Sequence, residues 1–121
     1  MATIRREGDE VVVKLNDLEK AGALRGDVRA PASAVQSVRV VENPFKEVRG
    51  IRAPGTGFPR VIALGTWRRR GAKDFVAAYR GEPAVVVELA GAEFARLIVS
   101  SHDAAALAAE LQDEPEITNP S

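Results

Sequence analysis

Residues 65–75, GTWRRRGAKDF, hold the side chains of this sequence with the clearest capacity to bind another molecule. The guanidinium groups of Arg68, Arg69 and Arg70 can each form paired hydrogen bonds to a phosphate or a carboxylate. Lys73 adds a further positive charge, and Trp67 offers a ring on which a cation can stack. These residues therefore form a candidate site for an anionic group on a partner.

The geometry of this candidate site depends on the secondary structure around it. If the residues before the turn form a strand, Trp67 and Arg69 share one face, and Arg68 and Arg70 share the other. With Arg70 and Gly71 at the turn positions, Arg68, Arg70 and Lys73 would converge near the tip of a hairpin. The alternative is a solvated hairpin end with an arginine stacked on Trp67, and the sequence alone favours this structural interpretation.

Other residues of catalytic type have structural explanations. Ser101, His102 and Asp103 are the types of a catalytic triad, but consecutive residues entering a helix point in different directions and cannot pass a proton along. We expect them to cap that helix, with His102 on the surface. The chain has one histidine and no cysteine, so it lacks the usual ligands of a metal site. Four carboxylates show no acid–base spacing and are expected to be solvated charges: Asp9, Glu10, Asp17 and Glu19. We expect no catalytic residue, cofactor or metal.

The apolar periodicity of the first half predicts short strands and turns. Residues 2–7 and 10–15 alternate around a Gly-Asp pair and indicate a β-hairpin. A helix is expected at 16–26, because Asn16 is a good N-cap and Gly26 a good stop. Strands are expected at 27–31 and 35–41 with one helical turn at Ser33 between them, and a short helical segment within 42–51 that begins near Pro44. The glycines of APGTGFP (53–59) precede a strand rather than a helix, so they indicate a loop and not a phosphate-binding turn.

The second half predicts four more strands, at 60–67, 73–79, 84–89 and 93–100, whose short connections favour an antiparallel meander. A helix follows at 100–112, with Ser101 as the N-cap and an apolar stripe that includes Leu107 and Leu111. The fold class is therefore mainly β, a β-sandwich or barrel with a C-terminal capping helix that buries its stripe between two sheets. Residues 1–112 are expected to form one domain, and residues 113–121 a flexible acidic tail.

The composition excludes several classes of protein. A chain of 121 residues with 45% apolar and 28% charged residues is typical of one globular domain. It has neither the roughly 18–20 consecutive apolar residues of a membrane span nor the apolar run of a signal peptide. The 17 basic and 17 acidic residues cancel, which argues against a dedicated nucleic-acid binder. The absence of cysteine suits a reducing cytoplasm, where we expect the protein.

Charge is unevenly distributed along the chain. Residues 1–24 carry a net charge of −1, residues 25–80 carry +8 and residues 81–121 carry −7. The simpler interpretation is that the basic and acidic blocks lie side by side in the fold and neutralise each other. If they lie on different faces, they favour head-to-tail self-association or the capture of an anionic partner.

Much of this pattern resembles the small, stand-alone bacterial pleckstrin-homology-like (PH-like) proteins. The matching segments lie between about residues 10 and 112: DVRAPASAVQSVRVV (27–41), PGTG (54–57), GTWRRRGAKDF (65–75), AVVVEL (84–89) and a last strand that runs into DAAALAAEL. The resemblance implies a seven-stranded barrel capped by the C-terminal helix, and PH-like domains generally bind proteins, lipids or themselves. Phosphoinositide-binding PH domains concentrate Lys and Arg in the first hairpin, where this chain has EGDE (7–10), so that mode of lipid binding is not expected.

These observations leave three functions open. The one we favour is a non-enzymatic PH-like interaction module that binds a protein partner or a second copy of itself, because the charges are segregated along the chain. The second is peripheral binding to an anionic membrane or another polyanion through the arginine hairpin. The third is a small-molecule-binding barrel or an enzyme, against which the lack of converging polar groups argues.

Overall fold

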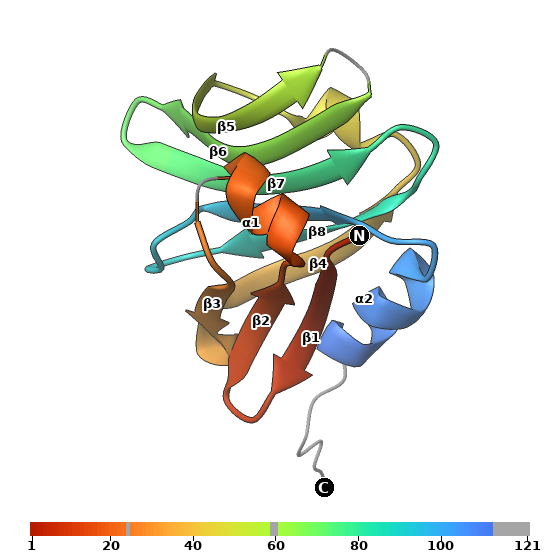
Figure 1. Cartoon of the computed structure of the whole chain (residues 1–121). Helices are drawn as coiled ribbons and strands as arrows, with labels where there is room; N and C mark the ends of the chain where they lie inside the picture. Colours follow the sequence, from red (N-terminus) through yellow and green to blue (C-terminus); the bar gives the residue numbers. More distant parts are fainter. Residues whose placement is uncertain (24, 59–60, 113–121) are drawn as a thin grey trace, which may run out of the picture.

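The structure is a computed structural model that describes residues 1–23, 25–58 and 61–112, and only the backbone of residues 51–58. The tail expected at residues 113–121 lies outside the described residues. Within them the fold is mainly β, with two sheets and a C-terminal helix that packs on both (Figure 1). Neither helix in these ranges is long and apolar enough to cross a membrane.

The smaller sheet begins with the expected hairpin. It consists of three antiparallel strands in the order β1-β2-β3: β1 (Thr3–Glu7), β2 (Glu10–Lys14) and β3 (Val28–Pro31). Gly8 in the turn between β1 and β2 has a φ of 62°, a value that glycine adopts at little cost. The prediction of a hairpin around the Gly-Asp pair is therefore confirmed.

The larger sheet has the strand order β4-β8-β9-β7-β6-β5. Its strands are β4 (Val35–Val41), β5 (Ile51–Phe58), β6 (Ile62–Arg69), β7 (Ala72–Tyr79), β8 (Ala84–Leu89) and β9 (Arg96–Ser100). One turn of 3-10 helix, η1 (Ala32–Ala34), joins β3 to β4 as expected, so one continuous segment leaves the small sheet and enters the large one. The helical segment expected within 42–51 is also one such turn, η2 (Pro44–Glu47).

The predicted antiparallel meander is wrong in one respect. Strand β9 lies between β7 and β8 and runs parallel to β7, while β8 pairs with β4 on its other side. The four residues between β7 and β8 can span the roughly 10 Å between strands two positions apart, because an extended residue covers about 3.3 Å. A short connection therefore fits both topologies, and its length does not distinguish them.

The predicted loop at APGTGFP is also wrong, because most of it lies in strand β5. This strand pairs with β6 along its length, with a register shift between Arg52 and Gly55. Glycine and proline weaken the strand signal, yet an edge strand with a bulge tolerates both. Strand β5 is one edge of the large sheet and β4 the other, so the described strands form two open sheets and no closed barrel.

The main core lies between the two sheets and under the C-terminal helix, α2 (Ala104–Gln112). The helix occupies the gap between the sheets, as predicted, and contributes Leu107 and Leu111 to the core. Its polar side chains reach the free edges of both sheets. The backbone N–H of Arg6 in β1 donates to Glu110 (3.3 Å), and Gln112 donates to the carbonyl oxygen of Val38 in β4 (2.7 Å). Helix α2 therefore covers edges that would otherwise pair with another strand.

The first helix, α1 (Asp17–Ala23), begins with a capping box. The Asn16 side chain accepts from the N–H of Glu19 (2.8 Å), and Glu19 accepts from the N–H of Asn16 (2.9 Å), which confirms the predicted cap. Glu19 was expected to be solvated, and this is wrong because it is 2% exposed. Its second carboxylate oxygen accepts a hydrogen bond of 2.6 Å from the hydroxyl of Tyr79, at the end of β7. The pKa of Tyr79 is raised mainly by burial of its hydroxyl and, to a smaller extent, by the carboxylate of Glu19.

Candidate functional site

The arginine-rich stretch forms the end of the β6–β7 hairpin. Arg68 is opposite Lys73 and Arg69 is opposite Ala72, so Arg70 and Gly71 form a two-residue turn. Gly71 has a φ of 73°, which suits the tight turns that match the twist of paired strands. The prediction that Arg70 and Gly71 occupy the turn is confirmed.

Trp67 anchors this hairpin in the fold. Its side chain is 8% exposed and belongs to a second apolar cluster, on the face of the large sheet that points away from the small sheet. The cluster includes Val86 and Ile98 of the sheet, and Phe45 and Val48 of the segment around η2 pack against it. Because the ring is covered, Trp67 holds the strand in place and is not a platform on which an exposed arginine could stack.

Asp74, opposite Trp67 in β7, provides a second anchor. Its side chain is 1% exposed and accepts two hydrogen bonds from Arg49, at 2.7 Å from Nε and 3.3 Å from Nη2. These bonds raise the pKa of Arg49, so its guanidinium remains charged at any ordinary pH. The segment after η2 is thereby fastened to β7 three residues beyond Gly71 of the hairpin turn.

Lys73 does not join the arginines electrostatically. Its ammonium lies 3.0 Å from the carboxylate of Glu93, in the connection between β8 and β9, and 5.0 Å from the centroid of the Phe94 ring. Arg25 also lies 5.0 Å from that ring and 3.6 Å from the carboxylate of Glu93. The hydrogen bond from Lys73 lowers the pKa of Glu93, which keeps this carboxylate ionised. The structure therefore brings Lys73 opposite Arg68 in register but pairs its charge elsewhere.

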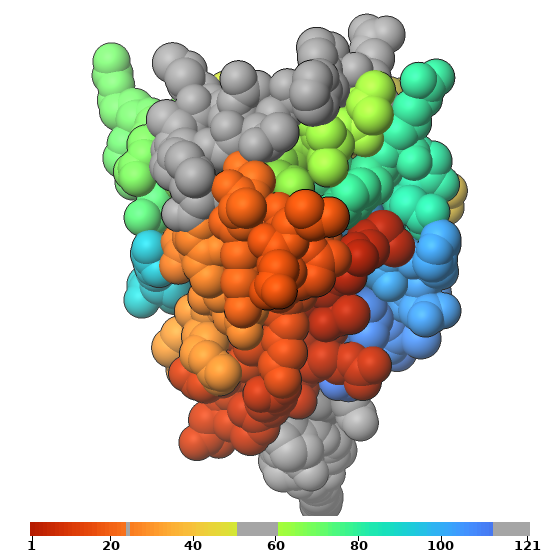
Figure 2. Space-filling view, viewed as in Figure 1, coloured from red at the N-terminus to blue at the C-terminus, as the bar shows by residue number. Residues whose placement is uncertain are grey.

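Arg68, Arg69 and Arg70 are exposed at the end of this hairpin, a segment that is bright green at the upper left of Figure 2. The side chains of Arg69 and Arg70 form no hydrogen bond or ion pair in the part of the chain that the structure describes. Several other cations do have acidic partners: Arg25, Arg29, Arg39, Arg49, Lys73 and Arg96. The pairing of charges thus leaves a positive tip on the hairpin.

The basic and acidic blocks of the sequence do meet in the fold. Arg25 and Lys73 of the basic block contact Glu93 of the acidic block, and Arg39 contacts Glu88 at 3.4 Å. The expected neutralisation is therefore present over the middle of the large sheet. It stops before the end of the β6–β7 hairpin.

Sequence reasoning missed a network of charges behind this hairpin. Arg39 lies 2.8 Å from Glu47 of η2, and Arg96 lies 3.2 Å from Glu88 and donates to the carbonyl oxygen of Glu47 at 3.1 Å. The hydrogen bond from Arg39 lowers the pKa of Glu47. Glu88, Arg96 and Asp74 are cross-strand neighbours in one row of the sheet. No spacing in the sequence indicates this row, because it depends on the insertion of β9 between β7 and β8.

Of the three triad-like residues, only Ser101 makes the predicted kind of capping bond, and it does so in the turn that precedes α2. The hydroxyl of Ser101 accepts from the N–H of Asp103 (3.0 Å), and α2 begins at Ala104. His102 is exposed, as expected, and its Nδ1 lies 2.7 Å from Glu82 rather than from either neighbour. In the described ranges, no group of three or more His, Cys, Asp and Glu residues is placed to hold a metal ion.

Comparisons with known proteins do not assign a family, because no family model, curated protein or solved structure matches this chain.

Proposed function

We propose that this chain is a non-enzymatic interaction domain of the PH-like type, and that it binds an acidic protein surface through the tip of the β6–β7 hairpin. One observation carries the proposal. The side chains of Arg69 and Arg70 are exposed and have no partner within the described chain, whereas the nearby Arg49 and Lys73 are each paired with an acid. Guanidinium groups in this state lose little when they pair with carboxylates of another molecule.

The hairpin is suited to recognition because its backbone is held in place. The buried ring of Trp67 and the Arg49–Asp74 pair fix its two strands. Gly50 packs against the carbonyl group of Arg68 so closely that a Cβ atom at this position would lie 2.5 Å from the oxygen. A preorganised tip loses less conformational entropy on binding than a flexible loop does.

Acidic protein is a better match than a phosphoinositide headgroup in the usual PH mode. In the first hairpin, Glu7 lies 2.9 Å from Lys14 and Glu10 lies 3.0 Å from Arg29, so this hairpin offers no surplus of positive charge. A second copy of the chain is one suitable partner, because residues 81–121 contain eight acidic residues and one basic residue. Self-association would then join the hairpin of one copy to the acidic part of the next.

The test compares two variants with the same change in net charge. Arg69→Gln/Arg70→Gln removes two cations from the tip, whereas Lys20→Gln/Lys46→Gln removes two exposed lysines elsewhere whose side chains have no partner in the described chain. Sedimentation across protein concentration measures self-association, and binding to immobilised polyglutamate measures affinity for acidic protein. Both are run at about 50 and 200 mM salt, because screening weakens contacts between exposed charges.

We expect the hairpin variant alone to lose binding, and the binding of the wild type to decrease with salt. Equal binding by the two variants would show that the hairpin tip is not the binding site. Binding to vesicles that contain phosphatidylserine, without binding to polyglutamate or self-association, would replace the acidic protein with an anionic membrane.

A further inference from the structure

A pocket of about 750 Å³ lies at the opposite end of the large sheet from the arginine tip. Residues 42–46 form one wall, and Arg80 and Gly81, which follow β7, form the other. Strand β7 begins at Ala72 beside the tip and ends at Tyr79 beside the pocket, so the two features are about 25 Å apart at about 3.3 Å per residue. The volume lies in the range of about 300–1,000 Å³ that is usual for small-molecule sites.

Local hydrogen bonds hold both walls of this pocket. The Asn43 side chain accepts from the N–H of Phe45 (3.1 Å), which fixes the turn that presents the Phe45 ring. On the other wall, the N–H of Arg80 donates to the carbonyl oxygen of Val61 (2.9 Å), and the N–H of Glu82 donates to that of Tyr79 (3.2 Å). The backbone of Arg80 is therefore fixed, while its side chain is exposed.

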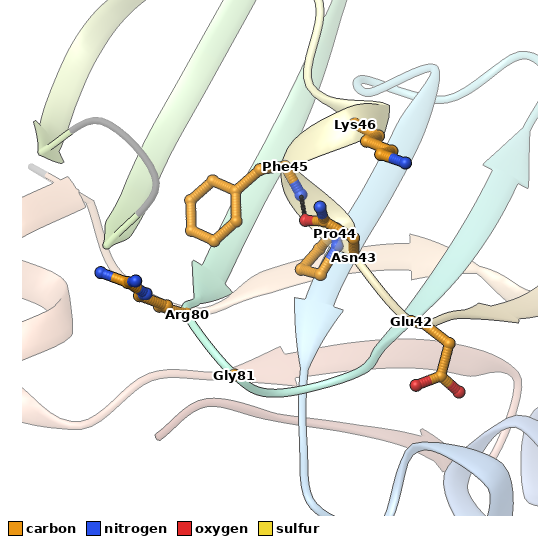
Figure 3. A pocket seen from close by; sticks show the side chains of 7 residues that line it. All are labelled: Glu42, Asn43, Pro44, Phe45, Lys46, Arg80 and Gly81. Carbon is orange, nitrogen blue, oxygen red and sulfur yellow. Dashed lines mark hydrogen bonds between the residues drawn. The ribbon is translucent and has the colours of Figure 1, made fainter.

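Figure 3 shows that the Phe45 ring and the Arg80 side chain extend to the same side of the pocket. The ammonium of Lys46 points away from them, and the carboxylate of Glu42 lies on the far side, beyond Gly81. Arg80 makes no side-chain hydrogen bond or ion pair with the chain as far as the structure describes it. The pocket thus places one aromatic ring and one unpaired guanidinium beside the same space.

We infer that this pocket binds a small organic anion in which a flat apolar group carries a carboxylate or a phosphate. The anionic group pairs with the guanidinium of Arg80, which matches both anions with two parallel hydrogen bonds. The flat group packs on the Phe45 ring, which is half-buried because it also packs against the cluster around Trp67. The site is distinct from the proposed protein-binding hairpin, and it takes a ligand of another class.

The two contacts together define the ligand. Inorganic phosphate can pair with Arg80 but leaves the Phe45 ring in water. A neutral aromatic compound can pack on the Phe45 ring but offers no anionic group to Arg80. A ligand with both features gains binding free energy from each contact, but it loses translational entropy only once because the two groups are joined. Phenyl phosphate and benzoate carry both features. A comparison of the two shows whether the site prefers a phosphate or a carboxylate.

The experiment is a titration of the full chain, labelled with ¹⁵N, followed by NMR shifts of the backbone amides. The probes are phenyl phosphate and benzoate, with inorganic phosphate and benzyl alcohol for comparison. We expect saturable shifts at residues 42–46 and 80–81 with at least one of the two aromatic anions, and at least about fivefold weaker binding of both comparison compounds.

Three variants test the assignment. Arg80→Gln should weaken binding of the aromatic anion by about tenfold or more, the loss expected for a charge-assisted contact. Phe45→Leu keeps an apolar side chain against the Trp67 cluster and should weaken binding several-fold. Arg70→Gln alters the other end of the sheet and should leave the titration unchanged, so that failure here is separate from failure of the hairpin proposal.

Shifts centred on the β6–β7 hairpin, an unchanged affinity in Arg80→Gln, or equal affinities for phenyl phosphate and inorganic phosphate would each overturn the inference. An unchanged amide spectrum of Arg80→Gln outside the pocket establishes that the variant is folded, so a loss of binding then reports on the side chain. Saturable binding of benzoate alone or phenyl phosphate alone supports the site and identifies its anion.

Discussion

Arg49 and Asp74 are 25 residues apart in the sequence and form a hydrogen-bonded ion pair, with Nε and Oδ2 2.7 Å apart and the carboxylate 1% exposed. The pair ties the segment after η2 to strand β7, directly behind the candidate hairpin. The removal of one member of such a pair leaves a buried charge without compensation. Replacement of either residue alone should therefore remove most of the stability that depends on the pair.

We predict that Arg49→Met lowers the free energy of unfolding by about 3 kcal/mol, and that Asp74→Asn in the same chain recovers much of this loss. Urea unfolding followed by Trp67 fluorescence measures both changes. Arg70→Gln, an exposed arginine in the same hairpin, should change stability by less than about 0.5 kcal/mol. A cost for Arg49→Met as small as that of Arg70→Gln would mean that the pair contributes nothing.

Glu47 gives stability a dependence on pH. Arg39 lowers the pKa of this carboxyl in the folded state, so its contribution is fully present above the unfolded value of about 4.3. It is lost as the pH falls through the lower, folded-state pKa. We expect wild type to be more stable than Glu47→Gln at pH 7, and the difference to shrink steadily below about pH 4. A difference that stays constant from pH 7 to pH 3 would contradict this assignment.

Trp67 should act through packing rather than through partner contact. Its replacement by Ala opens a cavity in the second apolar cluster and should cost about 3–5 kcal/mol. Trp67→Phe keeps most of the volume and should bind polyglutamate as the wild type does. Selective loss of binding by Trp67→Phe, with stability largely retained, would instead make Trp67 part of the recognition surface.

Tyr79 is the single tyrosine of the chain, which allows its ionisation to be followed by absorbance near 295 nm. Burial and the hydrogen bond to Glu19 raise its pKa, so the phenolate should appear only above the ordinary value of about 10. The stability linked to this raised pKa is present below about pH 10 and is lost as the pH rises toward the folded-state value. In Glu19→Gln the absorbance should rise at a lower pH, and an unchanged titration would show that burial alone sets the shift.

Gly50 and Gly8 form a matched pair for testing the close approach behind the hairpin. Both have positive φ values, 89° and 62°, so alanine is strained at each position. An added Cβ at Gly8 meets nothing within 4 Å, whereas at Gly50 it would lie 2.5 Å from the carbonyl oxygen of Arg68. We predict that Gly50→Ala costs at least about 1 kcal/mol more than Gly8→Ala in urea unfolding. Equal costs would show that the contact relaxes freely.

The turns and helix caps could be predicted because the residues that form them lie within a few positions of one another in the sequence. The first hairpin, the cap at Asn16 and the turn at Arg70 and Gly71 lie where the patterns placed them, and the C-terminal helix begins at Ala104, slightly later than expected. Strand β5 was not predicted because its glycines weaken the strand pattern and its proline is tolerated only at an edge or a bulge, which the assembled sheet defines. Nothing local marked Glu19 as buried, since its partner Tyr79 is 60 residues away.

The sequence by itself determined where the chain turns, which residues alternate across a strand and which helix face is apolar, because these properties follow from local sterics and hydrophobic period. It also placed the arginines at the end of a hairpin. Only the tertiary structure decided that β9 lies between β7 and β8, and therefore that Lys73, Arg39 and Arg96 meet acids while Arg69 and Arg70 do not. Strand order depends on the burial of whole sheet faces and on hydrogen bonds between distant segments, which leave no mark in a short stretch of sequence.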